Sequence, residues 1–155
     1  MIKKLIFRTI LYALVALVLI FVLIQFVPYG RSHTNPTIAN QPNWDTPQTL
    51  ELAKRACFDC HSNETIWPWY SNIAPVSWLV QRDVDDGRKV FNFSDIMSSR
   101  FANQGGISRF MEKSSEVINE GEMPPFFYLP LHPSAKLSTA EKQQLIQGLI
   151  ITGQK

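Results

Sequence analysis

The sequence predicts a small all-α domain that follows a single N-terminal transmembrane helix. Residues 9–27 form an almost uninterrupted apolar run. Further along, apolar residues recur at helical spacing between cap and stop residues, as in amphipathic helices. No segment shows the alternating pattern of a half-buried strand. We therefore expect one short-helix domain of roughly 110 residues behind the apolar segment.

The apolar run is long enough to cross a bilayer, since 19 residues at about 1.5 Å each span the roughly 30 Å hydrocarbon core. Lys3, Lys4 and Arg8 precede the run, whereas only Arg31 follows it closely. The positive-inside rule then keeps the N-terminus in the cytoplasm. For a bacterial inner membrane, the domain lies on the periplasmic or outer side.

A cleaved signal peptide is the alternative to an uncleaved anchor. Such peptides have a shorter apolar run that ends in small residues, and residues 25–29 do not resemble that site. We predict residues 1–8 in the cytoplasm, 9–27 as the anchor, 28–43 as a polar flexible tether and 44–155 as the domain. Beyond residue 31, eleven basic residues face 13 acidic ones, so the net charge of −2 predicts no nucleic-acid surface.

The two cysteines of the chain, Cys57 and Cys60, are followed at once by His61. This Cys-x-x-Cys-His spacing is typical of c-type haem attachment. Two thiols on one helical turn reach the two vinyl groups at one porphyrin edge, while the next side chain reaches the iron. We therefore predict one covalent haem c, with thioethers at Cys57 and Cys60 and His61 as the proximal iron ligand.

Three other interpretations of the motif remain open. A structural disulfide suits an exported protein but leaves His61 unexplained. A thioredoxin-like pair needs a strand-helix-strand pattern, which the sequence lacks. A zinc site needs further ligands, and the chain has no other cysteine.

The helices are predicted from their caps and apolar spacing. Thr46 and Pro47 begin a helix over 48–60 that ends in the motif. We expect a helix from Pro75 to 86 that Gly87 stops, a short one after Ser94, one over 107–120, and a last one after the capping box at 138–141. An aromatic loop separates the first two.

This arrangement resembles the small class I cytochromes c. More specifically, four runs resemble the haem-binding domain family, an exported cytochrome-c-like module: CFDCHSNETIWPWYSNIAPVSWLVQRDVDDGR, FNFSD, GEMPP and HPSAKLSTAE. The resemblance extends from about Trp44 to the last helix and implies a cytochrome-c-like fold around the haem. Relatives tend to end the last helix with an aromatic residue, where this chain has Gly148 and Leu149.

The distal iron ligand is expected to be Met123, because two prolines stiffen the chain just after it and the GEMPP run resembles the methionine loops of cytochromes c. Packing of a buried methionine beside a turn is the plainer interpretation. His132 is the alternative ligand, although His-Pro also reads as a turn. Met111 falls on an apolar helix face, which favours the core.

Large aromatic side chains follow the motif and the methionine. They suit the walls of a haem pocket, although core packing explains any single one equally well. The candidates are Trp67, Trp69, Tyr70, Trp78, Phe126, Phe127 and Tyr128. By resemblance to similar cytochromes, the Pro75 carbonyl is expected to accept the ring proton of His61, and Arg88 or Arg82 to pair with a haem propionate.

The predicted function is one-electron transfer by a membrane-anchored cytochrome to redox partner proteins at the membrane, rather than catalysis. The alternative is a haem-based sensor or peroxidase-like protein, which requires a displaceable distal ligand.

Overall fold

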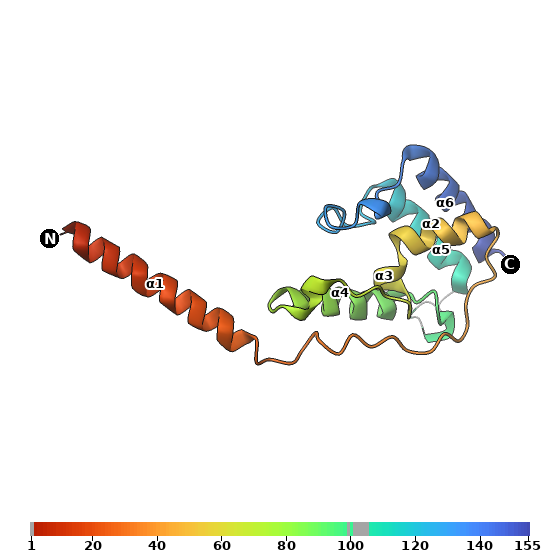
Figure 1. Ribbon diagram of the computed structural model, residues 1–155. Helices are drawn as coiled ribbons and strands as arrows, with labels where there is room; N and C mark the ends of the chain where they lie inside the picture. The colour runs from red at the N-terminus through yellow and green to blue at the C-terminus, as the bar shows by residue number, and fades with distance from the viewer. Residues whose placement is uncertain (1, 99, 101–105) are drawn as a thin grey trace. The chain divides into compact units, whose positions relative to one another are not determined.

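The computed structural model describes residues 2–98, 100 and 106–155. Within them lie six α-helices, three short 3₁₀ helices and no strand, which confirms the all-α prediction (Figure 1). The α-helices are α1 (Ile2–Ile24), α2 (Pro47–Ala56), α3 (Phe58–His61), α4 (Val76–Val90), α5 (Gly106–Asn119) and α6 (Thr139–Gly153); the 3₁₀ helices are η1 (Trp69–Asn72), η2 (Ile96–Ser98) and η3 (Pro133–Ala135).

The contacts divide the chain into two compact units. Unit 1 comprises residues 1–33 and 67–82, and unit 2 comprises residues 34–66 and 83–155. The boundaries of these units differ from those predicted for the anchor, tether and domain. The predicted organisation therefore stays a prediction.

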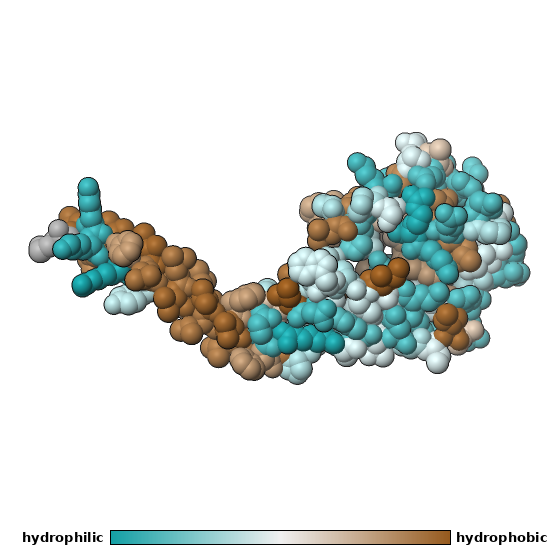
Figure 2. All heavy atoms as spheres, in the orientation of Figure 1, coloured by the Kyte–Doolittle hydropathy of each residue, from teal (hydrophilic) through white to brown (hydrophobic). Residues whose placement is uncertain are grey.

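In unit 1, α1 is long and apolar enough to cross a membrane by length and composition. Beyond the basic side chains near its N-terminus, apolar side chains cover α1, and none of its residues is buried (Figure 2). Residues 25–33 follow it and contact residues 67–82. In these contacts, the His33 ring stacks on Trp67 with 4.7 Å between ring centroids.

In unit 2, α5 packs along α6, and α2 also contacts α6 (Figure 1). The caps predicted from sequence are present. Thr46 Oγ1 accepts from the Thr49 N–H, and Ser138 with Glu141 forms a full capping box. Gly148 explains the missing aromatic residue in α6, because any Cβ there would collide with the Thr49 side chain of α2. A small residue at this point therefore lets the two helices approach.

The core of unit 2 is apolar and rich in phenylalanine. Phe91 stacks on Phe110 at 3.6 Å between ring centroids, and Phe58 stacks on Phe93 at 5.4 Å. Met111 is fully buried, as the sequence predicted. The other members are Leu52, Ala53, Ala56, Ile118, Leu137, Leu145 and Leu149.

Three predicted helices differ from the structure. The first does not continue to residue 60, because Cys57 leaves the helical conformation (φ −128°, ψ −34°) and starts the separate turn α3. The second does not stop at Gly87 but continues to Val90. Gly87 is needed there for close packing instead, since a Cβ would collide with the Cys60 carbonyl oxygen. The helix expected after Ser94 is only the 3₁₀ turn η2.

Candidate functional site

The Cys-x-x-Cys-His motif folds into a single turn that gathers its three functional side chains. The Cys57 N–H still donates to Ala53 in α2, at 2.8 Å. The Cys57 carbonyl then accepts from both the Cys60 N–H (3.2 Å) and the His61 N–H (2.9 Å). Because both bonds converge on one carbonyl, the two thiols and the imidazole are brought to the same short turn.

The residues after α4 hold His61 from two sides. The Phe93 N–H donates to the His61 carbonyl at 2.7 Å. His61 Nδ1 lies 3.2 Å from the Phe91 carbonyl oxygen. A carbonyl only accepts, so Nδ1 carries the proton and Nε2 keeps a free lone pair.

The Phe91 carbonyl thus occupies the position that the sequence analysis gave to Pro75. The Pro75 carbonyl instead accepts from the Trp78 N–H, at 3.1 Å. No side-chain pattern could have identified Phe91, because the acceptor is a backbone atom.

Burial sets the protonation states of the motif. It lowers the pKa of His61 below 6.5, which keeps the imidazole neutral at pH 7. It also raises the pKa of both thiols to about 12, with Cys60 adding to the effect at Cys57 and Asp83 and Asp59 at Cys60. The site therefore presents neutral thiols and a neutral imidazole.

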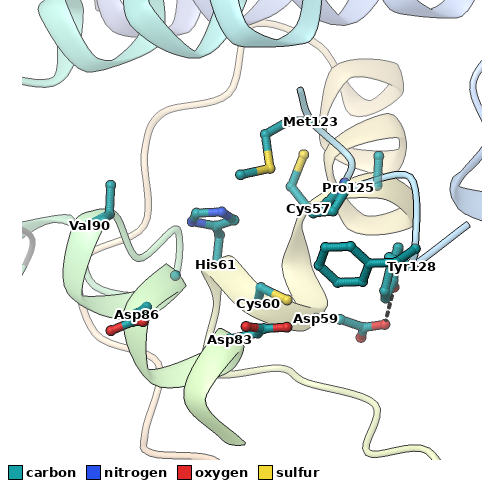
Figure 3. A pocket seen from close by; sticks show the side chains of 13 residues that line it. Cys57, Asp59, Cys60, His61, Asp83, Asp86, Val90, Met123, Pro125 and Tyr128 are labelled. Atoms are coloured by element: carbon teal, nitrogen blue, oxygen red, sulfur yellow. Dashed lines mark hydrogen bonds between the residues drawn. The ribbon is translucent and has the colours of Figure 1, made fainter. Parts of the chain in front are cut away.

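Met123 reaches the same site from the end of α5. Gly121 adopts a positive φ of 79°, which reverses the chain after the helix. The N–H groups of Glu122 and Met123 then both donate to the Val117 carbonyl, at 3.0 and 3.3 Å. The side chain of Met123 extends toward the His61 ring (Figure 3). It remains 38% exposed.

Two cavities adjoin these residues. One of about 350 Å³ lies against both cysteines, and another of about 200 Å³ reaches toward Phe93 and Phe110. Both are lined by Ala56, Cys57, His61, Val90 and Met123. Predominantly apolar walls, two thiols, an imidazole and a thioether form a donor set that fits haem.

The rim of the larger cavity includes groups that the sequence analysis did not single out. Asp59, between the two cysteines, accepts a 2.6 Å hydrogen bond from the Tyr128 hydroxyl at Oδ2 and a 3.0 Å bond from the Ile66 N–H at Oδ1 (Figure 3). Asp83 and Asp86 of α4 line the cavity as well. The Tyr128 contact connects the methionine loop to the cysteine motif.

His132, the alternative ligand, lies one turn beyond this contact. Its ring stacks on Tyr128 at 3.8 Å, and its Nδ1 lies 3.0 Å from the Tyr128 carbonyl. It is not among the residues that line either cavity. Of the two candidates, Met123 is the one that the structure brings to His61.

All three guanidinium nitrogens of Arg88 donate hydrogen bonds to protein acceptors. It donates to the carbonyls of Ser62 and Thr34 at 2.7 and 2.9 Å, and to the side chains of Asn35 and Thr65 at 2.9 Å each. These bonds connect α4 to two loop segments of unit 2. The predicted pairing of Arg88 with a haem propionate would have to displace them.

The aromatic side chains that follow the motif belong to unit 1. Trp69 packs edge-on against Tyr70 at 5.8 Å, while Trp78 and Pro75 lie in and just before α4. Their predicted role as walls of a haem pocket stays a prediction. In the part of the chain that the structure describes, no three His, Cys, Asp or Glu side chains gather as a metal site. Both cysteines are free thiols.

Comparison with known proteins supports haem binding by this chain. The profile of the haem-binding domain family matches residues 19–150. Cytochrome c peroxidase of Escherichia coli (strain K12) is 26% identical over 95 residues, which are 61% of this chain. The match covers 20% of that relative, so the chain spans about a fifth of its length. No solved structure matches.

Proposed function

This chain belongs to the haem-binding domain family, and we propose that it is a membrane-anchored monohaem cytochrome of the c type that carries single electrons outside the cytoplasm. One observation carries the proposal: Cys57, His61 and Met123 line the same two cavities, with Cys60 on the larger one. Haem, once bound, supplies a one-electron ferrous–ferric couple.

The residues of the chain have distinct tasks in this proposal. Cys57 and Cys60 would hold the haem through thioether bonds, and His61 would offer Nε2 to the iron. The Phe91 carbonyl fixes the orientation of the imidazole through Nδ1 and would increase its basicity. Met123 would supply a thioether sulfur as the second iron ligand. No side chain takes part in acid–base chemistry, because electron transfer moves no bonded group.

The second candidate is a peroxidase-like or sensing function, which the partial exposure of Met123 supports. A distal ligand on a partly exposed loop can be displaced, which opens an iron coordination position to small ligands. The E. coli relative is named a cytochrome c peroxidase, although the match covers only a fifth of it. The two candidates differ in whether Met123 stays bound.

Covalent attachment is tested by haem staining after denaturing electrophoresis. The full chain should keep its haem, and the Cys57→Ser and Cys60→Ser double variant should lose it. Loss of the stain from the unaltered chain would contradict a c-type cytochrome but not haem binding itself.

Distal ligation is tested by the far-red sulfur-to-iron band of the ferric protein. Met123→Ala should abolish the band, whereas Met97→Ala, at an exposed methionine of η2, should leave it unchanged. A band that survives Met123→Ala would direct attention to His132. Absence of the band from the unaltered protein, with rapid cyanide binding, would favour the second candidate.

The anchor and the partners are also part of the proposal. α1 would cross the bacterial inner membrane once, with the N-terminus in the cytoplasm, and redox proteins at the same membrane would exchange electrons with the domain. Retention of the chain in membranes after an alkaline carbonate wash is the expected result. Release by carbonate would contradict an uncleaved anchor.

A further inference from the structure

Within unit 1, hydrogen bonds connect residues 67–82 to the end of α1. The Gln25 side chain, one residue past the helix, pairs with both backbone groups of Ala74: its Nε2 donates to the Ala74 carbonyl at 2.9 Å, and its Oε1 accepts from the Ala74 N–H at 3.1 Å. Arg31 donates to the same Oε1 at 2.9 Å. The loop before α4 is therefore held at the point where α1 ends.

A second contact reinforces this junction. The backbone of Gly30 lies so close to the Ser77 carbonyl that a Cβ would collide with it, and Gly30 has a φ of 81°. Both features restrict the position to glycine. In addition, His33 Nε2 lies 2.9 Å from the Ser71 hydroxyl. Three successive points of residues 25–33 thus contact residues 71–77.

The surface beside this junction is apolar and aromatic. Trp69 is 76% exposed, Phe26 79% and Leu79 54%. Ile73 and Val76, which lie between Trp69 and Leu79 in the sequence, are exposed as well. The contacts within unit 1 therefore leave these apolar side chains exposed rather than packed.

Unit 1 contains basic residues but no acidic ones. All 13 Asp and Glu residues of the chain lie in residues 34–66 and 83–155, so unit 1 contains none. Outside α1 it carries Arg31 and Arg82. A surface with exposed tryptophan, aliphatic side chains and arginine, but without carboxylates, suits the headgroup region of a bilayer, which favours aromatic rings and attracts cations.

We propose that Trp69, Ile73, Val76 and Leu79, together with Phe26, rest in the lipid headgroup region of the bilayer that α1 crosses. The occupant of this apolar surface is lipid, because the surface begins where the candidate spanning helix ends. The inference rests on the anchoring part of the proposed function and not on the haem chemistry. It gives the aromatic loop after the motif a membrane role in place of the predicted haem wall.

The full-length haem protein in nanodiscs tests this. Tryptophan fluorescence is measured in phosphatidylcholine brominated near the headgroup and divided by the value in unbrominated lipid, so that quenching by haem cancels. Bromine should lower the fluorescence, and Trp69→Phe should remove about half of that decrease or more, because the exposed ring lies nearest the lipid. Trp44→Phe, in unit 2, should leave the decrease unchanged.

Each outcome has one meaning. Bromine quenching that Trp69→Phe leaves intact, in a chain that resists carbonate, overturns this inference but not the anchor. Release by carbonate overturns both. The visible spectrum separates the rival role: a Soret band shifted in Trp69→Phe, with unchanged bromine quenching, would assign the ring to the haem and overturn the inference.

Discussion

In the proposed cytochrome, the hydrogen bond between Tyr128 and Asp59 is expected to control how readily Met123 leaves the iron. Tyr128 lies five residues after Met123 on the same loop, and Asp59 lies inside the cysteine motif. The bond is short, at 2.6 Å, and its acceptor is a carboxylate. Tyr128→Phe removes only the hydroxyl and preserves the ring that stacks on His132.

The size of the effect follows from the kind of bond. Hydrogen bonds to charged groups contribute about 1.5–3 kcal/mol net, and the partial exposure of this pair favours the lower value. A loss of about 1.4 kcal/mol raises the equilibrium constant for loop opening about tenfold. Imidazole binds only to the open form, so its apparent dissociation constant should fall by about the same factor.

The assay is a titration of the ferric protein with imidazole, followed in the Soret band. The matched control is Phe126→Leu, on the same loop, where the ring is 83% exposed and contacts chiefly Phe127. An imidazole dissociation constant of Tyr128→Phe within twofold of the unaltered protein would refute the reasoning. The loop would then be held by other contacts.

Three further predictions concern stability. Gly87→Ala should lower the urea midpoint and the haem content, because the new Cβ meets the Cys60 backbone and overpacking of about 1–3 kcal/mol exceeds the helix-propensity gain of about 1 kcal/mol. Glu141→Gln should remove a pH dependence in acid: the Ser138 N–H and Arg55 lower the pKa of Glu141 from 4.5 to about 2, so its stabilising contribution is complete above pH 4.5 and is lost as the pH falls toward 2. Arg88→Lys should reduce the free energy of unfolding by about 2 kcal/mol, because one ammonium group cannot serve four spread acceptors.

Controls distinguish these effects from general sensitivity to substitution. Arg109→Lys, at an exposed arginine of α5, should leave unfolding unchanged. Glu112→Gln, outside any helix cap, should retain the acid dependence of the unaltered protein. A Gly87→Ala variant with normal haem content and urea midpoint would contradict the close approach of α4 to the motif.

The sequence predicted what local chemistry determines. Thr46 and Ser138 cap their helices because their hydroxyls reach the next free N–H groups, a property of three or four consecutive residues. The apolar N-terminal helix and the buried position of Met111 follow from hydrophobic pattern in the same way. The family runs added the link between the motif and the GEMPP loop, which lies more than sixty residues away.

Packing between distant segments accounts for what the sequence did not predict. From the sequence, Gly87 could either end a helix or make room for a neighbouring backbone. Only the close approach of the Cys60 backbone in the structure distinguishes the two roles. Cys57 interrupts its helix, although nothing in its side chain disfavours helix strongly. The hydrogen bond from Tyr128 to Asp59 joins a ring that the sequence predicted only as a pocket wall to an aspartate that resembles an ordinary surface residue.

Phe91 shows why the haem ligand geometry cannot be separated from the core. Its side chain is buried against Phe110 of α5, and its carbonyl accepts from the ring of His61. The same residue therefore connects the packing of α5 to the orientation of the His61 imidazole. Because Met123 follows α5 through the turn at Gly121, a shift of that helix would move Met123 directly, whereas it would reach His61 only through Phe91. In so small a domain, the helix that completes the core therefore also affects the distance between the two candidate ligands.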